Sequence, residues 1–205
     1  MSQSIEIEFK NELTITEYEK IKAFFKLDES QFFIQINHYF DTIAFALKEK
    51  GSALRIRKKG TAYELTLKQP YQDGLLETNQ ILTEIEAKEA LEKNIIPNGQ
   101  VADLLVDMQI DIKHIQFFGT LTTNRAEWEF ENGLLVLDYS TYLNTEDYEL
   151  EYEVHNRKKG QVVFNKLLTT LQIPVRKTDN KIKRFYLRKY SLLSSIKKSS
   201  EDKRS

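Results

Sequence analysis

Apolar and polar residues alternate along many short segments of this chain, which is the pattern of β-strands that bury one face. Residues 5–9, for example, read IEIEF. Segments of this kind, rich in β-branched and aromatic residues, predict strands over residues 3–11, 32–41, 53–59, 61–68, 75–81, 113–122, 124–131, 133–140 and 147–155. Gly60, Gly74 and Gly133 indicate tight turns between neighbouring strands.

Apolar residues spaced three and four apart predict helices in fewer segments. A stripe that includes Ile15, Tyr18 and Ile21 predicts one helix, which Thr14 or Thr16 would cap. Further helices are predicted over residues 83–94, 101–109 and 157–171, and from about residue 179 onward. Because strands outnumber helices and are joined by short turns, the expected fold class is α+β, an antiparallel sheet with helices outside it. About eight such strands can close into a barrel, which removes exposed edges.

Domain organisation is simple at the level of sequence. No internal repeat and no linker divides the chain, so residues 1–190 are expected to form one domain. Residues 191–205 form a polar tail that is expected to fray.

Composition narrows the class of protein. Of 205 residues, 30 are Lys or Arg and 31 are Asp or Glu, a net charge of −1 that argues against a general nucleic-acid partner. The absence of cysteine excludes disulfides, thiolate metal sites and cysteine nucleophiles. No apolar run has the length of a signal peptide or a membrane span, so a cytoplasmic protein without a membrane partner is expected.

The charged residues fall at alternate positions of the predicted strands, so each set shares one strand face. Such faces carry Glu6, Glu8 and Lys10; Arg55 and Arg57; Glu64 and Lys68; and Glu149, Glu151 and Glu153. A solvent-exposed face would explain any single strand, but three carboxylates on one face repel each other. Clustered carboxylates are typical of Mg²⁺ or Mn²⁺ sites, and the basic faces suit an anion with several phosphates. The combination indicates a metal with a polyphosphate.

Other chemistry has little support. The chain has no GxSxG, GxxxxGK[ST] or GxGxxG motif. His38, His114 and His155 lack the spacing of metal ligands.

Several motifs, taken together, resemble one known family. Glu6-x-Glu8-x-Lys10 is similar to the ExExK signature of the CYTH family, or triphosphate tunnel metalloenzymes, which includes class IV adenylyl cyclases, thiamine triphosphatases and inorganic triphosphatases. Further matching motifs follow in the family's order as far as about residue 190: YFDT (39–42), LRIR (54–57), LTLK (65–68), LLET (75–78), NRAEW (124–128), LVLDYS (135–140) and KIKRFY (181–186). The chain is most similar to the small single-domain CYTH proteins of Gram-positive bacteria.

The resemblance implies an eight-stranded antiparallel barrel around a polar tunnel, with the charged faces inside. It implies that the triphosphate is bound by Lys10, Arg55, Arg57, Lys68, Arg125, Lys181 and Arg184. The implied metal ligands are Glu6, Glu8, Glu149 and Glu151, with Glu153 as a further ligand or a group at the tunnel end. The implied catalytic groups are Glu6, Glu8, Lys10, Glu77 and Asp138, the last two orienting metal, water or the basic residues.

One point of register stays open. Relatives often have two glutamates in the late strand where this chain has three. The pair Glu149 and Glu151 is favoured over the pair Glu151 and Glu153 as metal ligands.

The function implied by the resemblance is hydrolysis of a triphosphate with Mg²⁺ or Mn²⁺, inorganic triphosphate being preferred to thiamine or nucleoside triphosphates. A class IV adenylyl cyclase is one alternative, but no recognisable adenine pocket supports it. A polyphosphate- or nucleotide-binding sensor without turnover is another, and the clustered glutamates weigh against it. The sequence leaves the oligomeric state open, a homodimer included.

Overall fold

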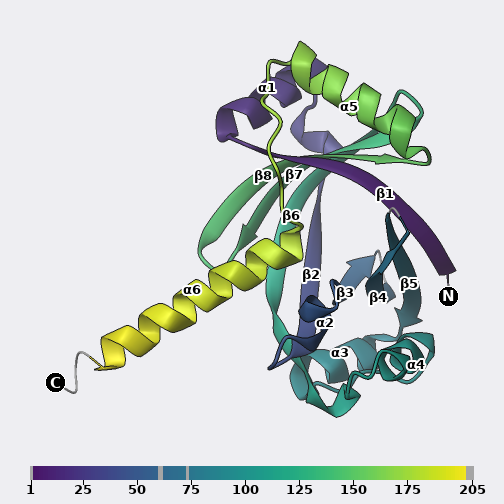
Figure 1. Cartoon of the computed structure of the whole chain (residues 1–205), viewed down its shortest axis with the longest axis vertical. Helices are drawn as coiled ribbons and strands as arrows, with labels where there is room; N and C mark the ends of the chain where they lie inside the picture. The colour runs from purple at the N-terminus through teal and green to yellow at the C-terminus, as the bar shows by residue number, and fades with distance from the viewer. Residues whose placement is uncertain (1, 60–61, 73, 202–205) are drawn as a thin grey trace.

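Eight antiparallel strands close into a barrel in the order β1-β5-β4-β3-β2-β6-β7-β8. The computed structural model describes residues 2–59, 62–72 and 74–201, so the predicted turn at Gly60 lies outside the described residues. The strands are β1 Ser2–Leu13, β2 Phe32–Thr42, β3 Ala53–Lys59, β4 Ala62–Tyr71, β5 Gly74–Leu82, β6 Ile115–Phe130, β7 Gly133–Tyr142 and β8 Thr145–Val154. The expected α+β class and the barrel are confirmed (Figure 1).

Strand β6 corrects one prediction. The sequence separated strands at 113–122 and 124–131, but Ile115–Phe130 is a single strand, paired with β2 and β7. The polar run Thr122-Thr123-Asn124 is typical of a turn and therefore predicted a break between two strands. Thr123, however, is buried on the inner face, where its hydroxyl bonds that of Ser140 at 3.0 Å. Polar residues are normal on the inside of this barrel.

Strand β1 closes the barrel by pairing with two different strands. Residues 2–6 pair with β5, from Ser2↔Asn79 to Glu6↔Leu75. Residues 7–13 pair with β8, from Ile7↔Val154 to Leu13↔Tyr148. The carboxylates of β1 and those of β8 therefore line one stretch of wall.

Helices form two groups on the outside of the barrel. Figure 1 shows α1 (Ile15–Phe25) and α5 (Arg157–Thr170) together at one end, and α2 (Ala46–Glu49), α3 (Glu84–Lys93) and α4 (Gln100–Asp107) at the other. Thr14 caps α1 and Thr83 caps α3, each in a capping box with a glutamate three residues on. The short helix α2 was not predicted; its first turn follows Asp41, whose carboxylate accepts the N–H of Leu47 at 2.9 Å. None of the helices described is long and apolar enough to cross a membrane.

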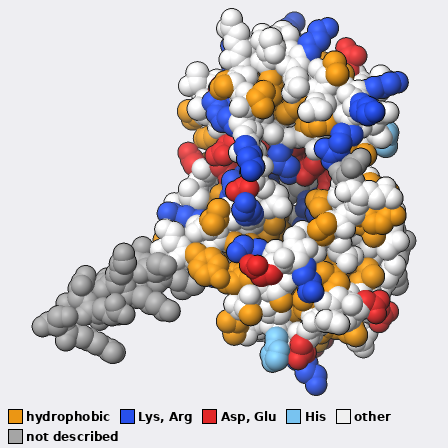
Figure 2. Space-filling model, viewed as in Figure 1, with side chains coloured by type: hydrophobic (Ala, Val, Ile, Leu, Met, Phe, Trp, Pro, Cys, Tyr) orange, Lys and Arg blue, Asp and Glu red, His pale blue; other side chains and the backbone are white. Residues whose placement is uncertain are grey.

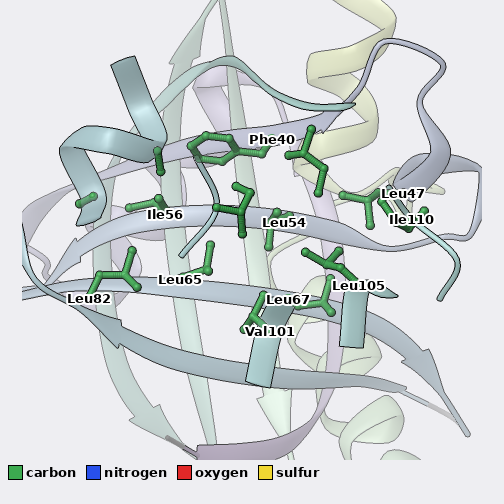
Figure 3. Packing of buried hydrophobic residues seen from close by; sticks show 14 residues of the cluster. Phe40, Leu47, Leu54, Ile56, Leu65, Leu67, Leu82, Val101, Leu105 and Ile110 are labelled. Carbon is green, nitrogen blue, oxygen red and sulfur yellow. The ribbon is translucent and has the colours of Figure 1, made fainter. Parts of the chain in front are cut away.

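The outer face of β3 and β4 is apolar and covered by helices. Leu54 and Ile56 of β3, with Leu65 and Leu67 of β4, are fully buried in a cluster that includes residues of α3 and α4 (Figure 3). Each buried side chain of this size stabilises the fold by roughly 1.5–3 kcal/mol. Because these residues alternate with charged ones, their outward packing turns the charged residues inward.

Helix α6 (Lys181–Glu201) starts at the barrel wall and extends away from it (Figure 1), into the segment that the sequence marks as a polar tail. Its first turns are held against β2 and β6. Phe185 lies against Gly119, where an added Cβ would approach the ring to 2.5 Å. The Tyr186 hydroxyl donates to the Asp41 carboxylate at 2.9 Å. These contacts fix the start of the helix, which carries Lys181.

Candidate functional site

A cavity of about 370 Å³ lies inside the barrel, lined by charged side chains from most strands and from the start of α6. We call it the central cavity. Its acidic lining residues are Glu6, Glu8, Glu64, Glu77, Glu127, Glu151 and Glu153, and its basic ones are Lys10, Arg55, Arg57, Lys68, Arg125 and Lys181. Figure 2 shows a hollow in the middle of one face with side chains of both charges around it. Among the lining residues named above, carboxylates outnumber lysines and arginines by one.

The structure gathers most of the residues singled out from the sequence around this cavity. Three lie outside its lining: Asp138, Glu149 and Arg184. Asp138 and Glu149 are fully buried in the wall. Of the three late glutamates, Glu151 and Glu153 line the cavity, whereas the sequence favoured Glu149 with Glu151 as the ligand pair.

Several of the lining residues were not assigned to the site from the sequence. Among them are Asn37, Glu64, Asn79 and Glu127. A signal was present, because each lies two residues from another inward-facing residue of its strand. Glu127 follows Arg125, and Asn37 precedes Tyr39.

Most lysines of the cavity are shared between carboxylates. Lys68 Nζ lies 2.6 Å from Glu6 and also contacts Glu77. Lys10 Nζ lies 2.5 Å from Glu8 and 4.0 Å from Glu151. Burial alone would raise the pKa of Glu77, but the charges of Lys68 and Arg55 lower that pKa below its ordinary value. Glu77 is therefore ionised at neutral pH.

The arginines of β3 are different, because their N–H groups are poorly satisfied. Arg57 Nε donates to Asn37 Oδ1 at 2.8 Å, and no carboxylate oxygen of the described residues lies within 4.0 Å of its guanidinium. Burial, with the positive charges of Arg55 and Arg125, lowers the pKa of Arg57 to about 9. Arg55 Nε is buried without a hydrogen-bond partner. Buried donors of this kind are costly unless a ligand accepts from them, so this part of the cavity suits an anion.

A surplus of negative charge lies where β1 meets β8. Glu153 is the cross-strand partner of Glu8, and no Lys or Arg nitrogen of the described chain lies within 4.0 Å of its carboxylate. Burial, together with the charges of Glu6 and Glu151, raises the pKa of Glu153 to about 7. The carboxylates of Glu6, Glu8 and Glu153 all line the cavity, Glu6 beside Lys68 and Glu8 beside Lys10, and carboxylates are the hard oxygen donors that Mg²⁺ and Mn²⁺ take. The donor set therefore fits a divalent cation.

Each of a second group of carboxylates, Asp138, Glu149 and Glu151, is in contact with at least two basic side chains. Arg125 makes a forked contact to Asp138, at 2.7 Å from Nε and 2.6 Å from Nη2. Lys181 Nζ lies 2.7 Å from Asp138 and 2.6 Å from Glu151, and it also contacts Glu149. Arg184 bonds Asp147 and Glu149 rather than the cavity. This network ties α6 to β7 and β8.

The fold and the site together define a class: a closed antiparallel barrel that encloses opposed carboxylates and cations. Residues 4–186 match the CYTH domain, and the chain belongs to the CYTH family. The resemblance inferred from the motifs is thereby confirmed.

Relatives agree with this assignment. The chain is 53% identical over 186 residues to YjbK of Bacillus subtilis, for which triphosphatase activity has been proposed; the alignment covers 91% of this chain and 96% of YjbK. A crystal structure from Bacillus halodurans, of a protein proposed to be an adenylate cyclase, is 45% identical with a TM-score of 0.87, covering 91% of this chain and all of that one. A Hippeastrum protein, proposed as an adenylyl cyclase and described with a dominant triphosphatase activity, is 21% identical with a TM-score of 0.67, covering 88% and 95%. This last likeness shows the fold alone.

Proposed function

We propose that this protein hydrolyses a triphosphate with the help of Mg²⁺ or Mn²⁺, and that inorganic triphosphate is its preferred substrate. One observation carries the proposal: the central cavity sets the unpaired Nε of Arg55, and Arg57 with only an amide partner, beside a surplus of carboxylates. A polyphosphate and a divalent cation together satisfy both. The activity proposed for YjbK, which is 53% identical, supports the same reaction.

The basic residues bind the phosphate oxygens in this proposal. Arg55 and Arg57 supply planar, forked donors, and Arg125, Lys68 and Lys10 add charge from β6, β4 and β1. Fixed cations that surround the bond to the leaving pyrophosphate stabilise the charge that develops there, and they need no reorganisation as the bond breaks.

In this proposal the acidic residues hold the metal ion and orient the lysine and arginine side chains. Glu6, Glu8 and Glu153 would hold the metal ion. When bound, the ion supplies charge neutralisation at the phosphate oxygens. Glu77 orients Lys68 and Arg55, and Asp138 orients Arg125 through its forked contact.

The lining favours a bare triphosphate over a nucleotide. Tyr39 is the one aromatic residue among the described residues that line the cavity. An adenine ring would therefore find little stacking surface, whereas every added phosphate finds a cation. A nucleoside adds bulk without adding contacts.

A phosphate-release screen tests the function. Triphosphate, thiamine triphosphate, ATP and long-chain polyphosphate are each incubated with Mg²⁺ and with Mn²⁺. We expect phosphate from triphosphate at a rate above that from ATP. Cyclic AMP from ATP with triphosphate left intact would establish the cyclase instead, and binding without any product would establish a sensor.

A matched pair of variants ties the reaction to the cavity. Glu8→Gln should abolish turnover while the circular dichroism spectrum is unchanged, because Glu8 is a cavity group and not part of the apolar core. Glu92→Gln removes the same charge from the exposed face of α3 and should leave turnover unchanged. Full activity of Glu8→Gln at saturating substrate would disprove the assignment.

A further inference from the structure

Three buried carboxylates lie together where β7 and β8 face the start of α6. One oxygen from each of Asp138, Glu149 and Glu151 lies within 4.8 Å of the others, a spacing suited to a cation. We call these three residues the carboxylate cage. The cage adjoins the central cavity at Glu151, and Lys10, at 2.5 Å from Glu8 and 4.0 Å from Glu151, lies between the cage and Glu8.

The cage already holds a cation. Lys181 Nζ lies 2.7 Å from Asp138 Oδ2 and 2.6 Å from Glu151 Oε1, and it contacts Glu149 Oε1. An ammonium group has three N–H donors and no acceptor. Each carboxylate of the cage takes one of them, so no donor of Lys181 is left for a phosphate oxygen.

The outer oxygens of the cage are bonded from the other side. Arg125 Nε donates to Asp138 Oδ1 at 2.7 Å, and its Nη2 to Glu151 Oε2 at 3.1 Å. Arg184 Nη1 donates to Glu149 Oε2 at 2.6 Å. The arginines therefore orient three carboxylates so that one oxygen of each lies at Lys181 Nζ; Asp138 Oδ2, which Arg125 Nη2 also bonds at 2.6 Å, is shared between the two cations.

We propose that Lys181 is an internal cation that fills a second cation site, so that the chain binds one divalent ion, at Glu6, Glu8 and Glu153. The location of that ion rests on the proposed function. Replacement of Lys181 by a neutral residue leaves three buried carboxylates with only Arg125 and Arg184 bonded to them, so one negative charge of the cage loses its counter-charge, a costly state. The variant then admits a second divalent ion into the cage, because convergent carboxylate oxygens are the donors that such ions take.

The number of bound ions tests the proposal without substrate, so its outcome is independent of whether the protein hydrolyses triphosphate. The full chain is titrated with Mn²⁺, and free Mn²⁺ is followed by electron paramagnetic resonance. We expect one ion per chain in the wild type and two in Lys181→Met. Arg184→Met is the matched control: it removes one positive charge from the same helix and the same network but leaves Lys181 in the cage, so it should bind one ion.

Thermal unfolding supplies a second measurement. A ligand that binds only the folded state raises its stability in proportion to the logarithm of ligand concentration. Mn²⁺ should therefore raise the Tm of Lys181→Met more than that of the wild type or of Arg184→Met. An equal rise in all three proteins would contradict the proposal.

Two further variants keep the test decisive if Lys181→Met does not fold. Glu153→Gln should lose most of the affinity for the single ion, whereas Asp138→Asn should retain it, since Asp138 binds lysine and arginine rather than metal. Two ions in the wild type, or loss of the single ion in Asp138→Asn, would overturn the proposal. So would one ion in a folded Lys181→Met.

Discussion

At the scale of single residues, the cations of the central cavity differ in how many partners they already have. Lys68 is shared by Glu6 and Glu77, and Lys181 is surrounded by three carboxylates. Arg57 has only the amide of Asn37 among the described residues. A buried arginine without an ion-pair partner is costly to the fold, and an anionic ligand would supply that partner.

Arg57→Ala should therefore lower kcat/KM for triphosphate by on the order of 100-fold, as expected for a desolvated charge-assisted contact. Arg57→Lys should recover only part of this loss, because the planar fork is absent. Lys88→Ala, on an exposed part of α3, is the control that should change nothing. If all three variants kept wild-type kinetics, Arg57 would have no part in binding.

The sequence alone predicted that these residues share one face of each strand. It did not predict how far along the barrel each residue lies. Glu149, Glu151 and Glu153 alternate in the same way, and nothing in that alternation says which of them meets the cavity. The answer depends on α6, because Lys181 and Arg184 cover Glu149 and leave Glu153 open. Those contacts join residues about thirty positions apart, beyond the reach of local pattern.

At the scale of elements, the segment between α5 and α6 is held against β1 and α1. The Asn11 side chain donates to the carbonyl of Pro174 at 3.1 Å and accepts the N–H of Arg176 at 2.6 Å. Arg176 then makes a forked contact to Glu17 of α1, at 2.8 and 2.9 Å. These bonds hold the chain at Pro174 and Arg176, shortly before α6 begins at Lys181. Helix periodicity predicted α6 but could not predict these contacts, which lie in an irregular segment.

The contact of Arg176 with Glu17 makes part of the stability depend on pH. The hydrogen bonds from Arg176 lower the pKa of Glu17 below its ordinary value of 4.5. The contribution is therefore complete above that value and is lost as the pH falls through the lowered pKa. Glu17→Gln should reduce the free energy of unfolding by about 1 kcal/mol at neutral pH and by less in acid.

Urea unfolding of the wild type and Glu17→Gln at several pH values measures this. Gln still accepts the N–H of Thr14, so the helix cap is retained. Glu19→Gln, at an exposed position of the same helix, is the control and should show no comparable pH-dependent difference. A Glu17→Gln difference that stayed constant from neutral pH into acid would contradict the assignment.

At the scale of the whole molecule, the chain is nearly neutral, but the barrel gathers many of its charged side chains in the interior. Alternation in Leu54-Arg55-Ile56-Arg57 predicted one apolar and one charged face but not which was inside. The helices decide, because α3 and α4 cover the leucine and isoleucine side. The family resemblance supplied that direction in advance; the residues by themselves did not.

The balance of charge in the cavity also predicts a requirement for metal. Seven carboxylates and six cations line it, so without metal a polyanion meets a site with no net attraction. Calorimetry should show triphosphate binding with Mg²⁺ present and at least a tenfold weaker affinity with a chelator at matched ionic strength. Equal affinity in both buffers would show that the arginines alone suffice.

Strand β1 pairs with β5 and with β8, and β8 is the last strand of the barrel to be synthesised. Strand β1 leaves the ribosome before the other strands of the barrel, and its residues 7–13 need β8 to complete their hydrogen bonds; Lys10 meets Glu151 only then. Until then half of β1 is an unpaired edge, which other chains could join. The opposing carboxylates of Glu8 and Glu153 also meet only at this last closure. A growing chain therefore has no cavity in which to capture metal or phosphate, and ligand binding begins only after synthesis has passed the final strand.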